Sequence, residues 1–83
     1  MREFTDSDET VWVATIARRH GPDYKGRYHL IFSPKEGGEL FSLVDVRWNS
    51  EETAERTLAT MSTVELRRRL RSATGRSRVP GLP

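Results

Sequence analysis

Two apolar stripes in the C-terminal half of the chain cannot lie on one side of a single helix. Each stripe has helical spacing, and the members are Ala54, Leu58 and Met61 in the first and Leu66, Leu70 and Ala73 in the second. On one straight helix over residues 51–73 the two stripes would lie roughly 130° apart. Ser62, followed by Glu65 three residues later, matches a capping box, which is typical of a helix start. The sequence therefore predicts two short helices with a break near Ser62.

Other signals set the outer ends of these two helices. Asn49 or Ser50 begins the first helix, and Asn49 with Glu52 matches a capping box. Gly75 is expected to end the second helix, since glycine is common just beyond a helix C-terminus.

Three segments before these helices have strand-like composition and spacing. They are Val11–Ala17, Arg27–Ser33 and Leu40–Trp48, separated by loops that contain Gly21-Pro22 and Gly37-Gly38. In the second segment Tyr28, Leu30 and Phe32 point one way, and Arg27, His29 and Ser33 point the other, as on a strand with one buried face. We therefore predict an α+β fold, in which a three-stranded antiparallel sheet is followed by two short helices packed on one face.

The third of these segments does not keep one alternating phase. Phe41 and Leu43 occupy odd positions, whereas Val44, Val46 and Trp48 occupy even ones. Either a β-bulge lies near Leu43-Val44, or both faces of the strand are covered there. We favour the bulge, because Asp45 and Arg47 then share the polar face and form a surface pair.

The length of 83 residues is enough for one domain. We assign residues 1–10 to an acidic N-terminal segment, residues 11–75 to the domain, and residues 76–83 to a mobile basic tail. The expected core lies between one sheet face and the helices and consists of Trp12, Ala14, Ile16, Tyr28, Leu30, Phe32, Val44, Val46, Leu58, Met61, Leu66 and Leu70.

The second face of the predicted sheet also carries apolar side chains, namely Val11, Val13 and Ile31. An apolar patch of this kind often marks a protein-interaction surface, so a partner or a second copy of the chain is one expectation. The alternative is that the N-terminal segment or the tail folds over this face.

Several kinds of site are excluded or lack support. The chain has no cysteine, which rules out disulfides, thiolate chemistry, zinc ribbons and iron–sulfur clusters. His20 and His29 are the only histidines and have no converging ligands or orienting groups, and His29 is expected to be solvated on the polar strand face. We therefore predict no catalytic residue, no metal site and no cofactor. No segment reaches membrane-spanning length and residues 1–10 do not resemble a signal peptide, so we expect a cytoplasmic protein without a membrane partner.

Two segments of the chain are basic. Residues 18–29 contain Arg18, Arg19, Lys25 and Arg27 against Asp23, and residues 62–83 contain six arginines against Glu65. Antiparallel pairing of the first two strands would bring the first four cations together, with Tyr24 at the tip of the loop. Such a cluster can contact a nucleic-acid backbone, or it can be only a polar loop.

The arginines of the second helix also have two interpretations. Arg67, Arg71, Arg76 and Arg78 can grip phosphates or an acidic protein. Alternatively, these arginines only interact favourably with the helix dipole near its C-terminal end, while Glu65 pairs with Arg68 or Arg69.

One family resembles the chain in the order of its elements. The run Gly21-Pro22-Asp23-Tyr24, a strand, a glycine hairpin, a third strand and a helix opened by Ser50-Glu51-Glu52-Thr53-Ala54-Glu55 resembles the later two-thirds of a double-stranded-RNA-binding domain that lacks its first helix. This resemblance implies loop and helix contacts with an RNA backbone. Tyr24 stands where that family has a histidine, and Glu51 and Glu52 stand where it has lysines.

Two functions therefore follow as hypotheses. The first is a small non-enzymatic module associated with nucleic acid, which uses Arg18, Arg19, Tyr24, Lys25, Arg27, Arg67, Arg71, Arg76 and Arg78. The second is a protein-interaction module, a homodimer or an adaptor, that uses the second sheet face.

Overall fold

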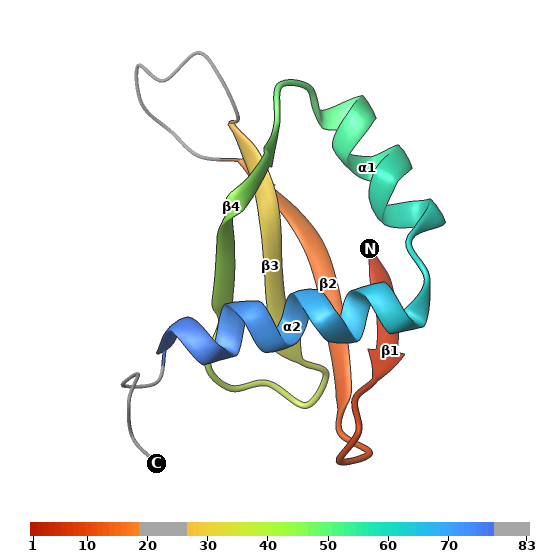
Figure 1. The fold of residues 1–83 in the computed structure, drawn as a ribbon, viewed down its shortest axis with the longest axis vertical. Coiled ribbons are helices and arrows are strands. Elements are labelled where there is room, and N and C mark those ends of the chain that lie inside the picture. Colours follow the sequence, from red (N-terminus) through yellow and green to blue (C-terminus); the bar gives the residue numbers. More distant parts are fainter. Residues whose placement is uncertain (19–26, 78–83) are drawn as a thin grey trace.

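The computed structural model describes residues 1–18 and 27–77, and for Val44, Asp45, Arg76 and Ser77 it describes the backbone alone. The described residues form one antiparallel sheet with both helices on the same face (Figure 1). The strands are neighbours in the order β1-β2-β3-β4. The elements are β1 (Arg2–Thr5), β2 (Val11–Arg18), β3 (Tyr28–Pro34), β4 (Phe41–Trp48), α1 (Glu51–Thr60) and α2 (Thr63–Ser77). The predicted α+β class is confirmed.

The sheet has a fourth strand that the sequence did not indicate. β1 lies within the segment assigned to an acidic N-terminus, and it pairs with β2 so that Phe4 faces Trp12. Phe4 is buried and meets the ring of Phe32 edge-to-face, with the ring centroids 6.1 Å apart. The domain therefore begins at Arg2 rather than at residue 11. A strand of four residues with one large apolar side chain has too little periodicity to be recognised from sequence.

The predicted phase slip in the last strand is confirmed as a change of register. Leu30 pairs with Leu43, but His29 pairs with Arg47, so β4 contains extra residues at this point. The shift lets Leu43 on one side of it and Trp48 on the other face the helices. Leu43 is fully buried, although the expected core left it out.

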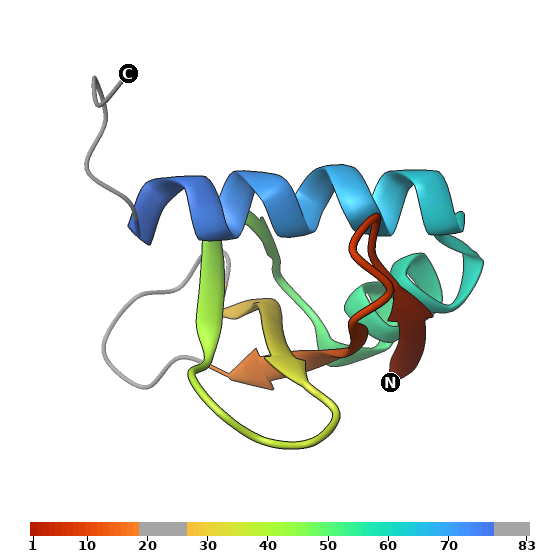
Figure 2. The same cartoon turned by 90° about the horizontal axis from the view of Figure 1, so that it is seen from below.

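The break between the helices is confirmed. α1 ends at Thr60 and α2 begins at Thr63, and the Ser62 hydroxyl accepts a hydrogen bond from the Glu65 amide at 3.1 Å. The N-cap of α1 is Ser50, whose hydroxyl accepts from the Thr53 amide at 3.2 Å, and the predicted Asn49–Glu52 capping box is wrong. Each helix therefore places its own apolar stripe against the sheet (Figure 2).

The second helix does not end at Gly75 but continues to Ser77. Positive φ angles at glycine occur at Gly37 and Gly38 among the described residues, so Gly75 does not adopt the left-handed conformation that ends many helices. Arg76 therefore belongs to α2 rather than to a tail.

Two arginines tie β1 to the helices. Arg2 donates from Nη1 to the carbonyl oxygens of Leu58, Ala59 and Met61 at 3.0, 3.1 and 2.7 Å. These carbonyls lie at the C-terminal end of α1, where a cation is favoured by the helix dipole and by the unpaired acceptors. Arg67 on α2 donates from Nε to the carbonyl oxygen of Thr5 at 2.7 Å.

The core lies between the helices and the sheet face that carries Ala14, Leu30 and Phe32. Both predicted helix stripes are buried in it, and the buried apolar residues are Phe4, Ala14, Leu30, Phe32, Leu43, Ala54, Leu58, Met61, Leu66, Leu70 and Ala73. Trp12, Ile16 and Val46 pack against this core while partly exposed. Tyr28 is half-buried, and the side chain of Val44 lies outside the described part of the structure. Neither α1 nor α2 is long and apolar enough to cross a membrane.

Candidate nucleic-acid interface and a neighbouring cleft

The predicted basic residues divide into described and undescribed ones. Arg19, Tyr24 and Lys25 belong to the undescribed residues 19–26, and Arg78 belongs to the undescribed residues 78–83. The backbone of Arg76 is helical, and its side chain lies outside the description. Arg18, Arg27, Arg67 and Arg71 are described, and they do not form one cluster.

Most of the arginines on α2 have partners within the protein. Arg69 donates to Glu65 at 2.7 Å, and Arg68 lies 3.2 Å from the other carboxylate oxygen of Glu65. Arg67 is half-buried and held by Thr5, as described above. The interpretation that Glu65 pairs with these arginines is confirmed for both Arg68 and Arg69. Arg71 is exposed and lies on the side of α2 that faces the β1–β2 turn.

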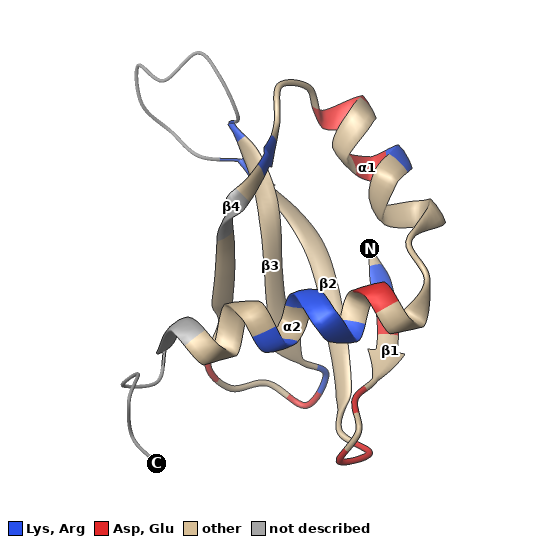
Figure 3. Cartoon of the chain, viewed as in Figure 1, with Lys and Arg blue, Asp and Glu red and all other residues tan. Residues whose placement is uncertain are grey.

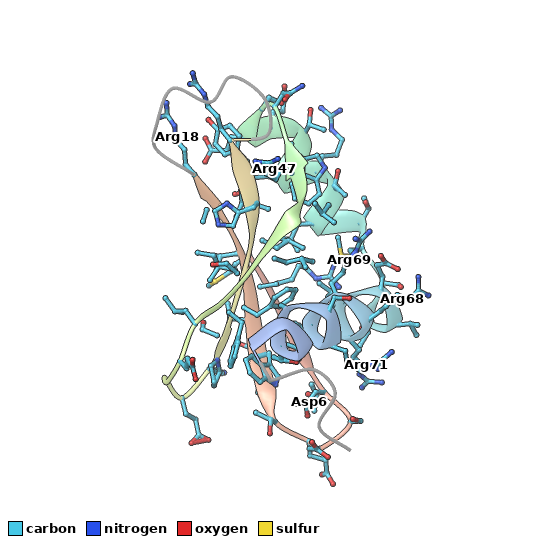
Figure 4. The ribbon with its side chains drawn as sticks, turned by 60° about the vertical axis from the view of Figure 1, so that its left-hand side comes forward. Asp6, Arg18, Arg47, Arg68, Arg69 and Arg71 are labelled. Carbon is cyan, nitrogen blue, oxygen red and sulfur yellow. The ribbon has the colours of Figure 1, made fainter. Side chains whose placement is uncertain are left out.

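The described cations of the first basic segment lie at the opposite end of the sheet, together with Arg47. We call this the arginine end and define it by Arg18, Arg27, Arg47, Tyr28 and Trp48 (Figure 3). Arg18 is the last residue of β2 and is exposed, and Arg27 directly precedes β3. Figure 4 shows Arg18 and Arg47 at this end, away from Arg68, Arg69 and Arg71 on α2.

Strand register places a cation beside two aromatic residues at the arginine end. Arg18 pairs with Tyr28, and Tyr28 pairs with Trp48, so the three residues form a row across three neighbouring strands. Tyr28 and Trp48 are half-buried, and Trp48 packs against the core. Neither aromatic was predicted as a site residue. The signal that could have indicated the row was the phase slip, because it returns Trp48 to the face of Tyr28.

Arg47 also lies at the arginine end, in the next row of paired residues. Ala17, His29 and Arg47 are aligned across β2, β3 and β4 on the face away from the helices. The predicted surface pair of Asp45 and Arg47 is not tested, since the Asp45 side chain is undescribed. The prediction of a solvated His29 is wrong, because only 8% of it is exposed.

One flank of the arginine end is acidic. α1 begins at Glu51, three residues after Trp48, and its first turn contains Glu51 and Glu52. These carboxylates suit the helix N-terminus, where the dipole favours negative charge. The arginine end is therefore acidic on the α1 side and basic on the side where β2 ends and β3 begins.

The second sheet face carries the residues predicted as an interface. Val11, Val13 and Ile31 are half-buried on the face opposite the helices. The central rows of this face contain Glu3, Val13 and Ser33, and then Thr15, Ile31 and Ser42, and Glu3 forms an ion pair with Lys35 at 3.3 Å. The N-terminal segment does not cover the face, because it is strand β1 in the same sheet.

A separate cleft lies between α2 and two loops, the β1–β2 turn and the β3–β4 loop. Figure 1 shows both loops below α2. The volume of the cleft is about 710 Å³. We call it the α2 cleft and define it by the residues that line it: Asp6, Ser7, Asp8, Thr10, Trp12, Glu39, Phe41, Arg67, Leu70, Arg71, Thr74 and Gly75. Arg67 and Arg71 were predicted from sequence as binding residues, but the acidic loops that face them were not.

Asp6 fixes the shape of the β1–β2 turn beside the α2 cleft. Its Oδ1 accepts from the amides of Asp8 and Thr10 at 2.8 and 2.9 Å, and its Oδ2 accepts from Trp12 Nε1 at 2.7 Å. Burial acts to raise the pKa of Asp6, but these hydrogen bonds and the nearby charge of Arg67 hold that pKa below its ordinary value. Asp6 is therefore a structural anion whose lone pairs are used within the protein.

Metal chemistry has no site in the part of the chain that is described. Residues 1–18 and 27–77 contain no group of three or more histidine, aspartate or glutamate side chains placed to hold a metal ion.

Comparison with known proteins adds no family assignment. The sequence matches no protein-family model, and no significant match is found among the curated proteins or the solved structures. The resemblance to a double-stranded-RNA-binding domain therefore stays a prediction.

Proposed function

We propose that this chain is a non-enzymatic module that binds single-stranded nucleic acid at the arginine end of its sheet. The observation that carries the proposal is the row of Arg18, Tyr28 and Trp48 across three strands. Proteins that bind single strands combine cations that follow the phosphate backbone with aromatic rings on which bases stack.

The charges of this end support a phosphate-bearing ligand. Arg18 and Arg47 are exposed, and Arg27 stands at the start of β3. In the sequence, the segment between Arg18 and Arg27 contains Arg19 and Lys25 against Asp23. Guanidinium groups bind phosphate oxygens in a bidentate manner, which favours arginine over lysine at such sites.

The acidic start of α1 favours a single strand over a duplex. A duplex presents phosphates on both sides of its groove, so one backbone would meet Glu51 and Glu52 when the other meets Arg18. A single strand can follow the cations alone and place its bases on Tyr28 and Trp48. Because Trp48 is packed on the core, it offers a fixed ring at little cost in side-chain entropy.

The test is fluorescence anisotropy with a labelled oligothymidylate and a duplex of the same length. We expect the single strand to bind more tightly than the duplex. Because each phosphate contact contributes a slope of about −0.7, the affinity should fall about threefold per arginine–phosphate contact between 50 and 200 mM salt. Absence of binding to the single strand at the lower salt concentration would refute the proposal.

Variants separate stacking from charge. Arg18→Gln should weaken binding and reduce the salt slope by about 0.7, since one phosphate contact is lost. Tyr28→Leu should weaken binding about tenfold or more, whereas Tyr28→Phe, which keeps the ring, should bind as the wild type does. Arg68→Gln is the matched control, because Arg68 is exposed on α2 and paired with Glu65. If Arg68→Gln weakens binding as much as Arg18→Gln does, the arginine end is not the site.

The second sheet face gives a second candidate function, which is self-association through Val11, Val13 and Ile31. The observation in its favour is that Val11, Val13 and Ile31 are half-buried on this face, with the uncharged Thr15, Ser33 and Ser42 beside them. Two copies could meet face to face over these uncharged residues, while Glu3 in each copy is paired with Lys35. Sedimentation equilibrium should give twice the chain mass for the wild type and the monomer mass for Val13→Lys. A monomer at all concentrations would dismiss this candidate.

A further inference from the structure

The α2 cleft carries opposite charges on its two walls. The helix wall contributes Arg67 and Arg71, and the loop wall contributes Asp6 and Asp8 from the β1–β2 turn and Glu39 from the β3–β4 loop. The charge of Arg67 helps to lower the pKa of Asp6. Arg67 also donates a hydrogen bond to the carbonyl oxygen of Thr5, and Asp6 accepts one from Trp12. The exposed charges that remain are Arg71 on one wall and Asp8 and Glu39 on the other.

Between the charged walls the cleft has apolar side chains. Trp12 and Phe41 lie side by side, with ring centroids 5.9 Å apart and ring planes tilted by 59°, and Leu70 adds an aliphatic side chain from α2. Trp12 Nε1 already donates to Asp6, so the exposed part of this ring offers only apolar contact. Asp6 and Arg71 both line this cleft, and Figure 4 shows Asp6 below α2.

We propose that the α2 cleft binds a free α-amino acid with an apolar side chain, recognised as its zwitterion. The ligand's carboxylate would pair with Arg71, its ammonium group with Glu39 and Asp8, and its side chain would lie against Trp12, Phe41 and Leu70. The volume of about 710 Å³ accommodates such a molecule and falls within the range of small-ligand pockets. This site is independent of the arginine end and of the function proposed for it.

The charge requirement can be tested with three ligands that share one side chain. L-Phenylalanine carries both charges, N-acetyl-L-phenylalanine carries only the carboxylate, and L-phenylalaninamide carries only the ammonium group. Each ligand is titrated to about 20 mM into the full 83-residue chain, because a ligand of this size is expected to bind with a low millimolar dissociation constant. Amide chemical shifts in ¹H–¹⁵N spectra report both the affinity and the site.

We expect L-phenylalanine to shift the amides of Asp8, Thr10 and Glu39 and those of α2 from Arg71 to Gly75. Each single-charge analogue should bind about fivefold more weakly, the effect of losing one solvent-exposed charge pair. The proposal is overturned if L-phenylalanine binds no more tightly than both analogues, if the shifts lie elsewhere, or if no shift occurs.

Two variants should then distinguish the walls. Arg71→Gln should weaken the binding of L-phenylalanine and of N-acetyl-L-phenylalanine about fivefold and leave the binding of L-phenylalaninamide unchanged. The double variant Asp8→Asn/Glu39→Gln should show the opposite pattern. All three side chains are exposed, so the fold should survive, and Arg56→Gln on α1 serves as the matched control. Equal effects of the wall variants on all three ligands would contradict the assigned roles.

Discussion

Arginines in this chain differ in what they contact, and the difference decides which of them can serve a ligand. Arg2 and Arg67 donate to backbone carbonyl oxygens and hold β1 against the helices. Arg68 and Arg69 share Glu65. Arg18 is exposed beside Tyr28 at the end of the sheet. A sequence shows all of these residues only as positive charge.

Arg2 should contribute to stability through the end of α1. Arg2→Met keeps an apolar stem but leaves three helix carbonyls without their shared donor. We expect the free energy of unfolding to fall by about 1–2 kcal/mol, as for a partly exposed charged hydrogen-bond donor at a helix C-terminus. Urea denaturation measures the change. Arg56→Met is the control, since its pair with Glu52 spans 3.5 Å between exposed side chains and should change stability by less than about 0.5 kcal/mol. Equal losses in both variants would contradict this role for Arg2.

Asp6 should make stability depend on acidic pH. Its pKa is lower in the folded protein than its ordinary value of 3.8, so folding favours the carboxylate. This contribution is complete above the ordinary value and is lost as the pH falls through the folded pKa. In Asp6→Asn we expect lower stability at neutral pH and a smaller further loss below pH 3.8, measured by urea denaturation at several pH values. Parallel pH curves for the two proteins would contradict the role of the Asp6 carboxylate.

At the scale of elements, the long periodic segments could be predicted and the short irregular ones could not. β2, β3 and the two helices have enough alternating or helical spacing to be read from sequence. The Ser62 break follows from the angle between two stripes, which is a local property. β1 has only Phe4 as an apolar signal, and its pairing depends on a turn that Asp6 closes through bonds to Asp8, Thr10 and Trp12.

The candidate sites were less predictable than the fold, because they depend on register and on contacts distant in sequence. Arg67 was predicted as a ligand contact, but Thr5, 62 residues away in sequence, accepts its hydrogen bond. The Tyr28–Trp48 pairing requires the register shift in β4 to have a particular size. The phase slip gave its position but not its size.

Two glycines should respond in opposite ways to the same substitution. Gly75 is helical, and a Cβ there would meet no atom within 4 Å, so Gly75→Ala should stabilise the protein by about 0.5 kcal/mol. Gly38 has a φ of +133°, so Gly38→Ala should destabilise it by about 1 kcal/mol or more. Thermal and urea denaturation of both variants measure the sign. If Gly75→Ala destabilises the protein, α2 does not continue through this residue in solution.

At the scale of the whole molecule, the two ends of the sheet differ in chemistry. At one end Arg18 stands in a row with Tyr28 and Trp48, and Arg47 stands in the next row with His29. The other end lies under α2, where acidic loops face arginines across an apolar cleft. The net charge of +2 does not reveal this difference between the two ends of the sheet. The arrangement supports separate binding events at the two ends.

Binding of a single strand at the arginine end is tested most directly by a chemical-shift titration of the ¹⁵N-labelled protein with an oligothymidylate of about ten nucleotides at low salt. We predict that the largest chemical-shift changes occur at the amides of Arg18 and Tyr28 and at the indole N–H of Trp48, and that these changes disappear at high salt. Changes confined to α2 between Arg68 and Arg71, or no change at all, would contradict this prediction.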